Sequence, residues 1–141
     1  MLKGMETIEL RVRAQAETAI KISQDLYGHS ALDRMIYPGH VSHPQNKIVN
    51  EQLHGAGTVI ALDLKGGQEA AFKFLNAIEV GVISTNLGDS KSIYTHPSTT
   101  THQRVSDQQK KSLSITPGLI RFSVGLEDSE DLITDILQAL E

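Results

Sequence analysis

The arginine at position 121 is the side chain of this sequence best suited to binding a ligand. It lies in the run 119–124, LIRFSV, where Ile120, Phe122 and Val124 would share one face of a strand. A planar guanidinium on a rigid strand can hold a carboxylate through two parallel hydrogen bonds. The same pattern also fits an arginine on the solvated face of a sheet, so the spacing alone leaves both interpretations open.

Histidines and glycines are the other candidates for chemistry. His40 and His43 are three residues apart, but prolines and glycines surround them, so a helical pair of metal ligands is not expected. His96 and His102 match no zinc spacing. The glycines at 55–57 precede a predicted strand, whereas those of a dinucleotide fingerprint follow one, and no Gly-x-Ser-x-Gly occurs. We therefore predict no catalytic residue and no metal ligand in this chain.

Four helices are predicted from apolar residues that recur every three or four positions. The first covers about twenty residues from near the start of the chain to Gly28. The others follow residues 42–44, span 68–76, and begin at Asp128 or Ser129, either of which would cap the last helix. The predicted apolar sides are Ile8, Val12, Ala16, Ala19, Ile20 and Leu26; then Ile48, Val49 and Leu53; then Ala71, Phe74 and Leu75; and finally Leu132, Ile133, Ile136, Leu137 and Leu140.

Strands are predicted where branched residues cluster between turn signals. A long polar segment at 86–117 separates the last two strands, with a helix suggested only at 106–113. A polar segment of this length in a compact domain is usually functional or disordered. The predicted strands are 32–36, 58–64, 78–83 and 119–124.

Size and composition are those of a single soluble domain. The chain has 141 residues, a formal charge of −4, and 39% apolar residues, of which few are aromatic. It has no basic stripe with stacking aromatics, which argues against a nucleic-acid partner. No apolar run approaches the ~20 residues of a membrane helix, so no membrane partner is expected and we expect a cytoplasmic location.

Several stretches together closely resemble the carboxy-terminal domain of the Cys/Met-metabolism family of pyridoxal-phosphate (PLP) enzymes. Two long motifs dominate the resemblance, NLGDSKS at 86–92 continuing to HPSTTTH at 96–102, and GLIRFSVGLED at 118–128. The residues at 2–7 and 37–44 also fit, so the resemblance covers essentially the whole chain. It implies an α+β fold: the small C-terminal domain of a fold-type I PLP-dependent transferase. Such a domain has a mainly antiparallel sheet with helices packed on one face.

The resemblance assigns roles to four residues. Arg121 matches the arginine that binds the substrate α-carboxylate, Asn86 matches a position that contacts the substrate, and Leu87 is adjacent. Thr101 matches a threonine at the mouth of the active site. The motif containing Asn86 looks most like the O-succinylhomoserine sulfhydrylase branch, since methionine γ-lyases tend to have serine there.

The resemblance also implies what this chain lacks. Residues 1–141 would form a single substrate-binding domain, and none of the eight lysines matches the Schiff-base lysine of the family. That lysine belongs to the large domain, so the chain alone is not expected to bind PLP or to be active. The chain would then be an expressed piece, a proteolytic remnant or a split gene product.

The expected parent enzyme performs γ-replacement, making homocysteine from an activated homoserine. Its partners would be the amino-acid substrate and further copies of itself in a homotetramer. A methionine γ-lyase, a cystathionine γ-synthase or lyase, and a non-catalytic interaction module are the alternatives.

Overall fold

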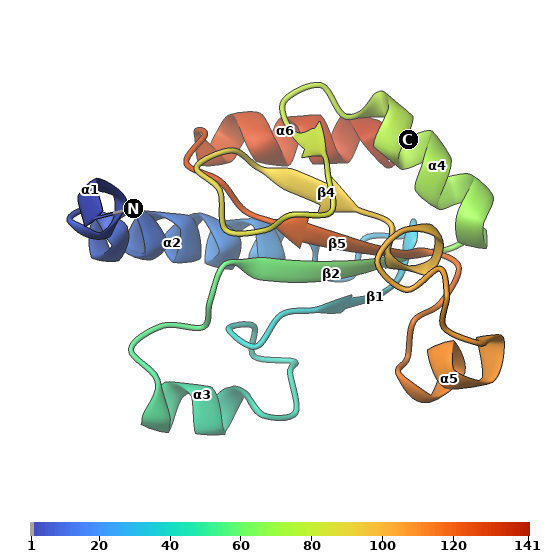
Figure 1. Ribbon diagram of the computed structural model, residues 1–141, viewed down its shortest axis with the longest axis horizontal. Coiled ribbons are helices and arrows are strands. Elements are labelled where there is room, and N and C mark those ends of the chain that lie inside the picture. Colours follow the sequence, from blue (N-terminus) through green and yellow to red (C-terminus); the bar gives the residue numbers. More distant parts are fainter. Residues whose placement is uncertain (1) are drawn as a thin grey trace.

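The computed structural model describes residues 2–141 and is built on one five-stranded sheet (Figure 1). The spatial order is β1-β2-β5-β4-β3. Every neighbouring pair is antiparallel except β3 with β4, which is parallel. The predicted α+β class with a mainly antiparallel sheet is therefore confirmed. The strands are β1 (Leu32–Ile36), β2 (Val59–Leu64), β3 (Val82–Ile83), β4 (Ile93–Thr95) and β5 (Leu119–Ser123).

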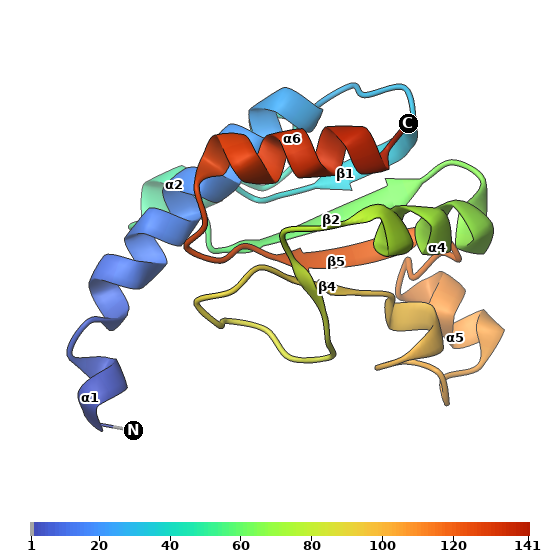
Figure 2. The same cartoon turned by 90° about the horizontal axis from the view of Figure 1, so that it is seen from above.

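Three helices cover one face of the sheet: α2 (Ile8–Leu26), α4 (Gly67–Ala77) and α6 (Ser129–Ala139). Figure 2 shows α2 and α6 side by side over the strands. They share one apolar core with the inward residues of β2, β4 and β5, as predicted for helices packed on one face. The buried core residues of the strands include Ile60, Leu62, Tyr94, Ile120 and Phe122, and those of the helices include Ile22, Leu26, Phe74, Leu132 and Ile136.

The remaining helical segments are short and peripheral (Figure 1). They are α1 (Leu2–Met5), α3 (Asn46–Gln52), the 3₁₀ turn η1 (Pro97–Thr99) and α5 (Asp107–Ser112). The helix predicted at 106–113 is confirmed as α5, which begins with a capping box. The predicted apolar side of α3 is mostly wrong, because only Val49 is buried while Ile48 and Leu53 are exposed.

The predicted apolar side of α2 is also partly wrong. Ile8, Val12 and Ile20 are exposed. The buried face has the predicted alanines and Leu26, but it also has Ile22 and two polar residues that were not predicted. The first half of α2 extends beyond the edge of the sheet, as both views show, so Ile8 and Val12 have no layer to pack on. The buried residues of α2 are Gln15, Ala16, Ala19, Ile22, Ser23 and Leu26.

The strand predicted at 78–83 is shorter than expected. Only Val82 and Ile83 pair in the sheet. The N–H groups of Glu79 and Val80 instead donate at 3.0 Å to the two carboxylate oxygens of Asp135 on α6. This contact holds the start of the segment as a turn and keeps it out of the sheet.

The polar segment at 86–117 contains a strand that the sequence did not predict. β4 has three residues and pairs with β5 on one side and with β3 on the other. Its register places Thr95 directly opposite Arg121.

Within residues 2–141, no helix combines the length and the apolar composition needed to cross a bilayer.

Candidate functional site

Arg121 lies at the centre of the sheet, on the face that the helices leave open. β5 is paired on both sides, and Arg121 stands opposite Ala61 of β2 and Thr95 of β4. Its neighbours Ile120 and Phe122 are completely buried on the helix side, so the alternation predicted for this run is confirmed. Arg121 itself is half-buried.

The guanidinium of Arg121 is held by one of its nitrogens. Nη2 donates to the main-chain oxygens of Thr85 (2.9 Å) and Asn86 (2.8 Å), and to the hydroxyl oxygen of Thr95 (2.9 Å). Three acceptors therefore share its two protons. The Nε atom, in contrast, is buried and has no acceptor among residues 2–141. A buried donor without an acceptor is costly, so this guanidinium has hydrogen-bonding capacity that the described chain does not meet.

Arg121 also has no counter-ion among residues 2–141. The ion pairs found within residues 2–141 do not include it. Arg34 provides the contrast, because its Nε lies 2.9 Å from the buried carboxylate of Asp63. Burial lowers the pKa of Arg121, yet a guanidinium remains a cation at physiological pH. A half-buried cation without a counter-ion among the described residues favours an anionic ligand.

Two side chains from other elements fix the segment after β3 beside Arg121. The N–H of Gly88 donates to the hydroxyl of Ser123 at 2.9 Å. The side-chain amide of Gln15 donates to the main-chain oxygens of Asp89 (2.7 Å) and Val124 (2.9 Å). Gly88 has a φ of 76°, a conformation that favours glycine. These contacts hold the turn that carries Asn86.

Ser92 and Glu127 close the far end of the same segment. The carboxylate of Glu127 accepts from the N–H of Ser92 at 2.7 Å and from its hydroxyl at 2.9 Å. The Ser92 hydroxyl in turn accepts from the N–H of Gly125 at 2.9 Å. A Cβ on Gly125 would lie 2.3 Å from the nitrogen of Ser92, so only glycine allows this close approach.

Some of the predicted site residues lie next to Arg121 in the structure, and one does not contact it. Asn86 contacts Arg121 through its main-chain oxygen, and the adjacent Leu87 is 58% exposed on the same turn. Thr101 is exposed, and its hydroxyl oxygen lies 2.9 Å from Nδ1 of His102. No hydrogen bond joins Thr101 to Arg121 within the described chain. Three further residues hold Arg121 or the segment beside it and were not predicted as site residues: Thr95, Gln15 and Ser123.

Two of the histidines, His40 and His96, are buried and pack within the fold. The buried His96 has both ring nitrogens engaged, at 2.8 Å from the Thr99 hydroxyl and 2.8 Å from the Pro117 oxygen. His40 is buried against the ring of Tyr27, with ring centroids 4.4 Å apart. Among the described residues, no three His, Cys, Asp or Glu side chains are placed to hold a metal ion.

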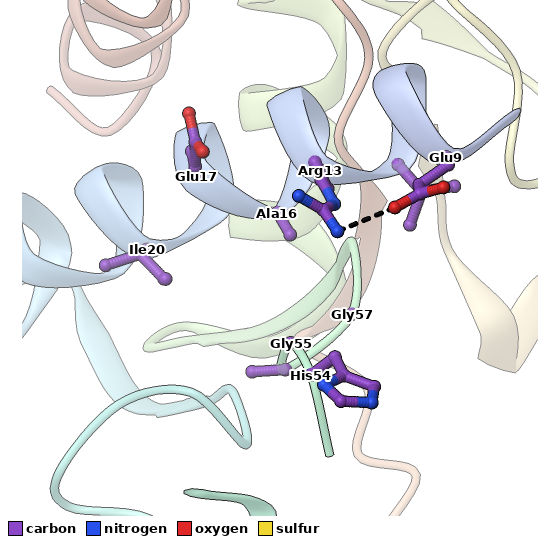
Figure 3. A pocket seen from close by; sticks show the side chains of 10 residues that line it. Glu9, Arg13, Ala16, Glu17, Ile20, His54, Gly55 and Gly57 are labelled. Atoms are coloured by element: carbon purple, nitrogen blue, oxygen red, sulfur yellow. Dashed lines mark ion pairs between the residues drawn. The ribbon is translucent and has the colours of Figure 1, made fainter. Parts of the chain in front are cut away.

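A separate hollow of about 660 Å³ lies between α2 and the residues 54–57 (Figure 3). Val12, Ala16 and Ile20 form its apolar part. Its arginine is neutralised, because Arg13 Nη2 lies 2.6 Å from the Glu9 carboxylate. Arg121 does not line this hollow, which is therefore not part of the site described above.

The lysines do not provide an attachment point for a PLP cofactor. All are exposed except Lys110, which is half-buried and donates to the main-chain oxygen of Ser98 at 3.1 Å. A lysine that forms a Schiff base is activated by desolvation or by a neighbouring cation. None of these lysines is buried, so their surroundings do not fit the Schiff-base attachment of PLP.

Comparison with known families gives a match over the full length. The sequence model of the family described as Cys/Met metabolism PLP-dependent enzyme matches residues 1–141. O-succinylhomoserine sulfhydrylase of Pseudomonas aeruginosa is 40% identical over 139 residues, covering 99% of this chain and 34% of that enzyme. L-methionine gamma-lyase of Fusobacterium nucleatum subsp. polymorphum is 36% identical over 141 residues, covering 100% of this chain and 36% of that enzyme.

Solved structures agree with the sequence relatives. Cystathionine gamma synthase from Xanthomonas oryzae pv. oryzae, in complex with aminoacrylate and cysteine, superposes with a TM-score of 0.94 at 30% identity, over 99% of this chain and 36% of that chain. A putative O-acetylhomoserine (thiol)-lyase from Campylobacter jejuni subsp. jejuni, which contains a pyridoxyl-lysine phosphate, gives a TM-score of 0.94 at 31% identity, over 99% and 33%. The predicted resemblance and fold class are confirmed. The chain spans about a third of the length of the relatives it matches.

Proposed function

Because this chain belongs to the Cys/Met-metabolism family of PLP-dependent enzymes, we propose that it is the substrate-carboxylate domain of such an enzyme. Residues 1–141 form this domain, and the cofactor and its lysine belong to another part of the parent protein. The relatives are about three times as long as this chain, which leaves room for that part.

The half-buried, uncompensated cation of Arg121 is the observation that supports this proposal. A substrate α-carboxylate would supply both the counter-ion and the acceptors that the guanidinium lacks. One carboxylate oxygen could accept from Nε, and the other could replace one of the three acceptors that share Nη2. The rigid strand and the fixed turn then orient the substrate backbone, including its Cα–H bond.

The chain contributes binding and orientation, while the cofactor stores the electrons released at the substrate carbons when it is bound. Asn86 and Leu87 are proposed to contact the substrate beside its carboxylate, since their turn is hydrogen-bonded to Arg121. Thr101 is proposed to line the mouth of the completed active site. Its exposure leaves its hydroxyl accessible for such a contact.

The Arg121 role is tested by substituting Arg121→Lys in the full-length, PLP-loaded enzyme that contains this chain. The KM for the amino-acid substrate should rise at least about tenfold, since a hydrogen bond to a charged group contributes about 1.5–3 kcal/mol. The inhibition constant of the corresponding amine, which has no carboxyl group, should not change. Arg34→Lys is the matched control, because Arg34 lies on the same sheet but already pairs with Asp63. An unchanged KM in Arg121→Lys would refute the carboxylate role.

We assign the parent reaction to γ-replacement, with homocysteine made from an activated homoserine and a sulfur nucleophile. The NLGDSKS and HPSTTTH motifs and the 40% identity to an O-succinylhomoserine sulfhydrylase support this choice. The 36% identity to a methionine gamma-lyase supports γ-elimination as the second candidate. Product analysis distinguishes them. Homocysteine from an acylated homoserine and sulfide indicates replacement, whereas an α-keto acid and ammonia from methionine indicate elimination.

We also propose that the parent enzyme is a cytoplasmic homotetramer. The tetramer is tested by light scattering of the full-length protein, which should give four times the mass of one chain. Cell fractionation should recover the enzyme with the cytosolic proteins. A monomeric full-length protein that binds no PLP would instead favour a non-catalytic interaction module.

A further inference from the structure

Thr95 is a buried hydroxyl in direct contact with the arginine of the proposed site. It is 1% exposed and lies on β4, directly opposite Arg121 in the sheet register. Its hydroxyl oxygen accepts the 2.9 Å hydrogen bond from Arg121 Nη2. The same hydroxyl donates to the main-chain oxygen of Ser84.

These two contacts fix the polarity of the Thr95 hydroxyl. A hydroxyl has one proton and two lone pairs, whereas a guanidinium can only donate. Since Ser84 offers an oxygen and therefore takes the proton, the lone pairs are left for Arg121. Towards Arg121, the Thr95 hydroxyl therefore acts only as an acceptor, and it helps to fix the position of Nη2.

The contact with Ser84 extends the effect to the neighbouring turn. The N–H of Ser84 donates to the main-chain oxygen of Tyr94 on β4 at 3.1 Å. The N–H of Asn86 donates to the Ser84 hydroxyl at 3.3 Å. Three successive main-chain oxygens, those of residues 84, 85 and 86, therefore point at the Thr95–Arg121 pair. One hydroxyl stabilises both the arginine and the turn that carries Asn86.

We propose that Thr95 is the positioning residue of the carboxylate site, setting the orientation of the Arg121 guanidinium and of the 84–86 turn together. This inference rests on the proposed function of Arg121 as the carboxylate ligand. Without the hydroxyl, the Ser84 oxygen loses its buried donor, and Nη2 keeps only the Thr85 and Asn86 oxygens. Both of these oxygens belong to the segment that Thr95 no longer fixes, so the guanidinium and the segment can shift together. The branched side chain of threonine has restricted χ1 rotamers on a strand, which limits the positions that its hydroxyl can take.

The test compares Thr95→Val, which has nearly the same shape without the hydroxyl, with Thr95→Ser, which keeps it. In the full-length PLP-loaded enzyme, Thr95→Val should raise the KM for the amino-acid substrate about tenfold, because a displaced guanidinium no longer meets the carboxylate in the required geometry. Thr95→Ser should have a KM near the wild-type value. The inhibition constant of the carboxyl-free amine should be unchanged in both variants.

Thr116→Val is the matched control for loss of stability. The Thr116 hydroxyl donates to the buried carboxylate of Asp63 on β2, so the variant loses a part-buried hydrogen bond to the same sheet without touching Arg121. Its KM should stay at the wild-type value although its thermal stability falls. If Thr95→Val does not fold, Thr95→Cys, whose thiol is a weak acceptor, takes its place.

The outcomes separate this inference from the proposed function. A raised KM in Arg121→Lys with an unchanged KM in Thr95→Val would overturn the role of Thr95 and leave that of Arg121 intact. A parallel rise in the inhibition constant of the carboxyl-free amine would show that Thr95→Val disturbs the whole site, which also overturns the inference. An unchanged KM in Arg121→Lys itself would refute the proposed function.

Discussion

The side-chain amide of Gln15 donates a 2.7 Å hydrogen bond to the main-chain oxygen of Asp89, 74 residues further along the chain. The same nitrogen donates to the main-chain oxygen of Val124 at 2.9 Å. A single buried amide on α2 thereby joins the turn beside Arg121 to the end of β5. The helix layer and the open-face site are linked through this residue.

Replacing Gln15 by glutamate should loosen that turn. Gln15→Glu keeps the shape but puts a carboxylate against two carbonyl oxygens, which should cost at least about 2 kcal/mol of unfolding free energy. Urea unfolding measures the loss, and hydrogen exchange should quicken at Gly88, whose N–H bonds to Ser123. Gln24→Glu, on the exposed side of the same helix, should leave both measurements unchanged. Equal stabilities for the two variants would contradict the bridging role.

The hydroxyl of Tyr94 is the second testable feature. Its ring stacks on Phe122 at 4.3 Å and is completely buried, while its hydroxyl has no partner among residues 2–141. Removing an unsatisfied buried polar group relieves its desolvation cost, so Tyr94→Phe should be neutral or should stabilise the fold by up to about 1 kcal/mol. Thermal unfolding checks this, with Tyr27→Phe as the exposed control. Destabilisation by more than about 1 kcal/mol would reveal a hidden partner for the hydroxyl.

Stability should fall at alkaline pH because of Tyr37. Burial raises the pKa of Tyr37 from 10.0 to about 12, and its hydroxyl donates to the Gly57 oxygen at 3.0 Å. The folded state therefore binds the phenol proton more tightly than the unfolded state. The resulting stability is fully present below pH 10 and is lost as the pH rises towards 12.

Urea unfolding between pH 8 and 12 at constant ionic strength measures this loss, over the window set by the shift of Tyr37. Tyr37→Phe should reduce the alkaline slope without abolishing it, because burial also raises the pKa of Tyr94. At neutral pH the variant should lose about 1 kcal/mol, the contribution of one hydrogen bond. An alkaline slope that does not change in Tyr37→Phe would show that other groups cause it.

The 141-residue chain should not attach PLP at a defined lysine. Because its lysines are exposed or, in the case of Lys110, bonded to Ser98, none is desolvated enough to favour a Schiff base at neutral pH. Borohydride reduction after incubation with PLP, followed by peptide mass spectrometry, should show only scattered, substoichiometric labelling. The full-length enzyme should give one fully labelled lysine outside residues 1–141. Stoichiometric labelling of one lysine in this chain would contradict the proposed division of the enzyme.

Local patterns predicted the elements whose burial is simple. β2, α4 and α6 were predicted close to their observed bounds, and Asp128 caps α6 by accepting from the Glu130 N–H at 2.8 Å. Each has a continuous apolar face that packs on a complete neighbouring layer. The side of α2 was not predictable in the same way, since half of that helix has no layer beneath it. β4 is too short to show a period, and its pairing with β3 and β5 alone makes it a strand.

The candidate site likewise has features that the sequence predicts and features that depend on the tertiary structure. The sequence by itself determined that residue 121 is an arginine on an alternating strand, and that the motifs around it resemble one enzyme family. Only the tertiary structure decided that this arginine has no counter-ion among residues 2–141, and that Thr95 and Asn86 hold it. Those partners lie 26 and 35 residues away in the chain. Periodicity reports the local burial of a segment, whereas contacts at such separations exist only once the strands have paired in register.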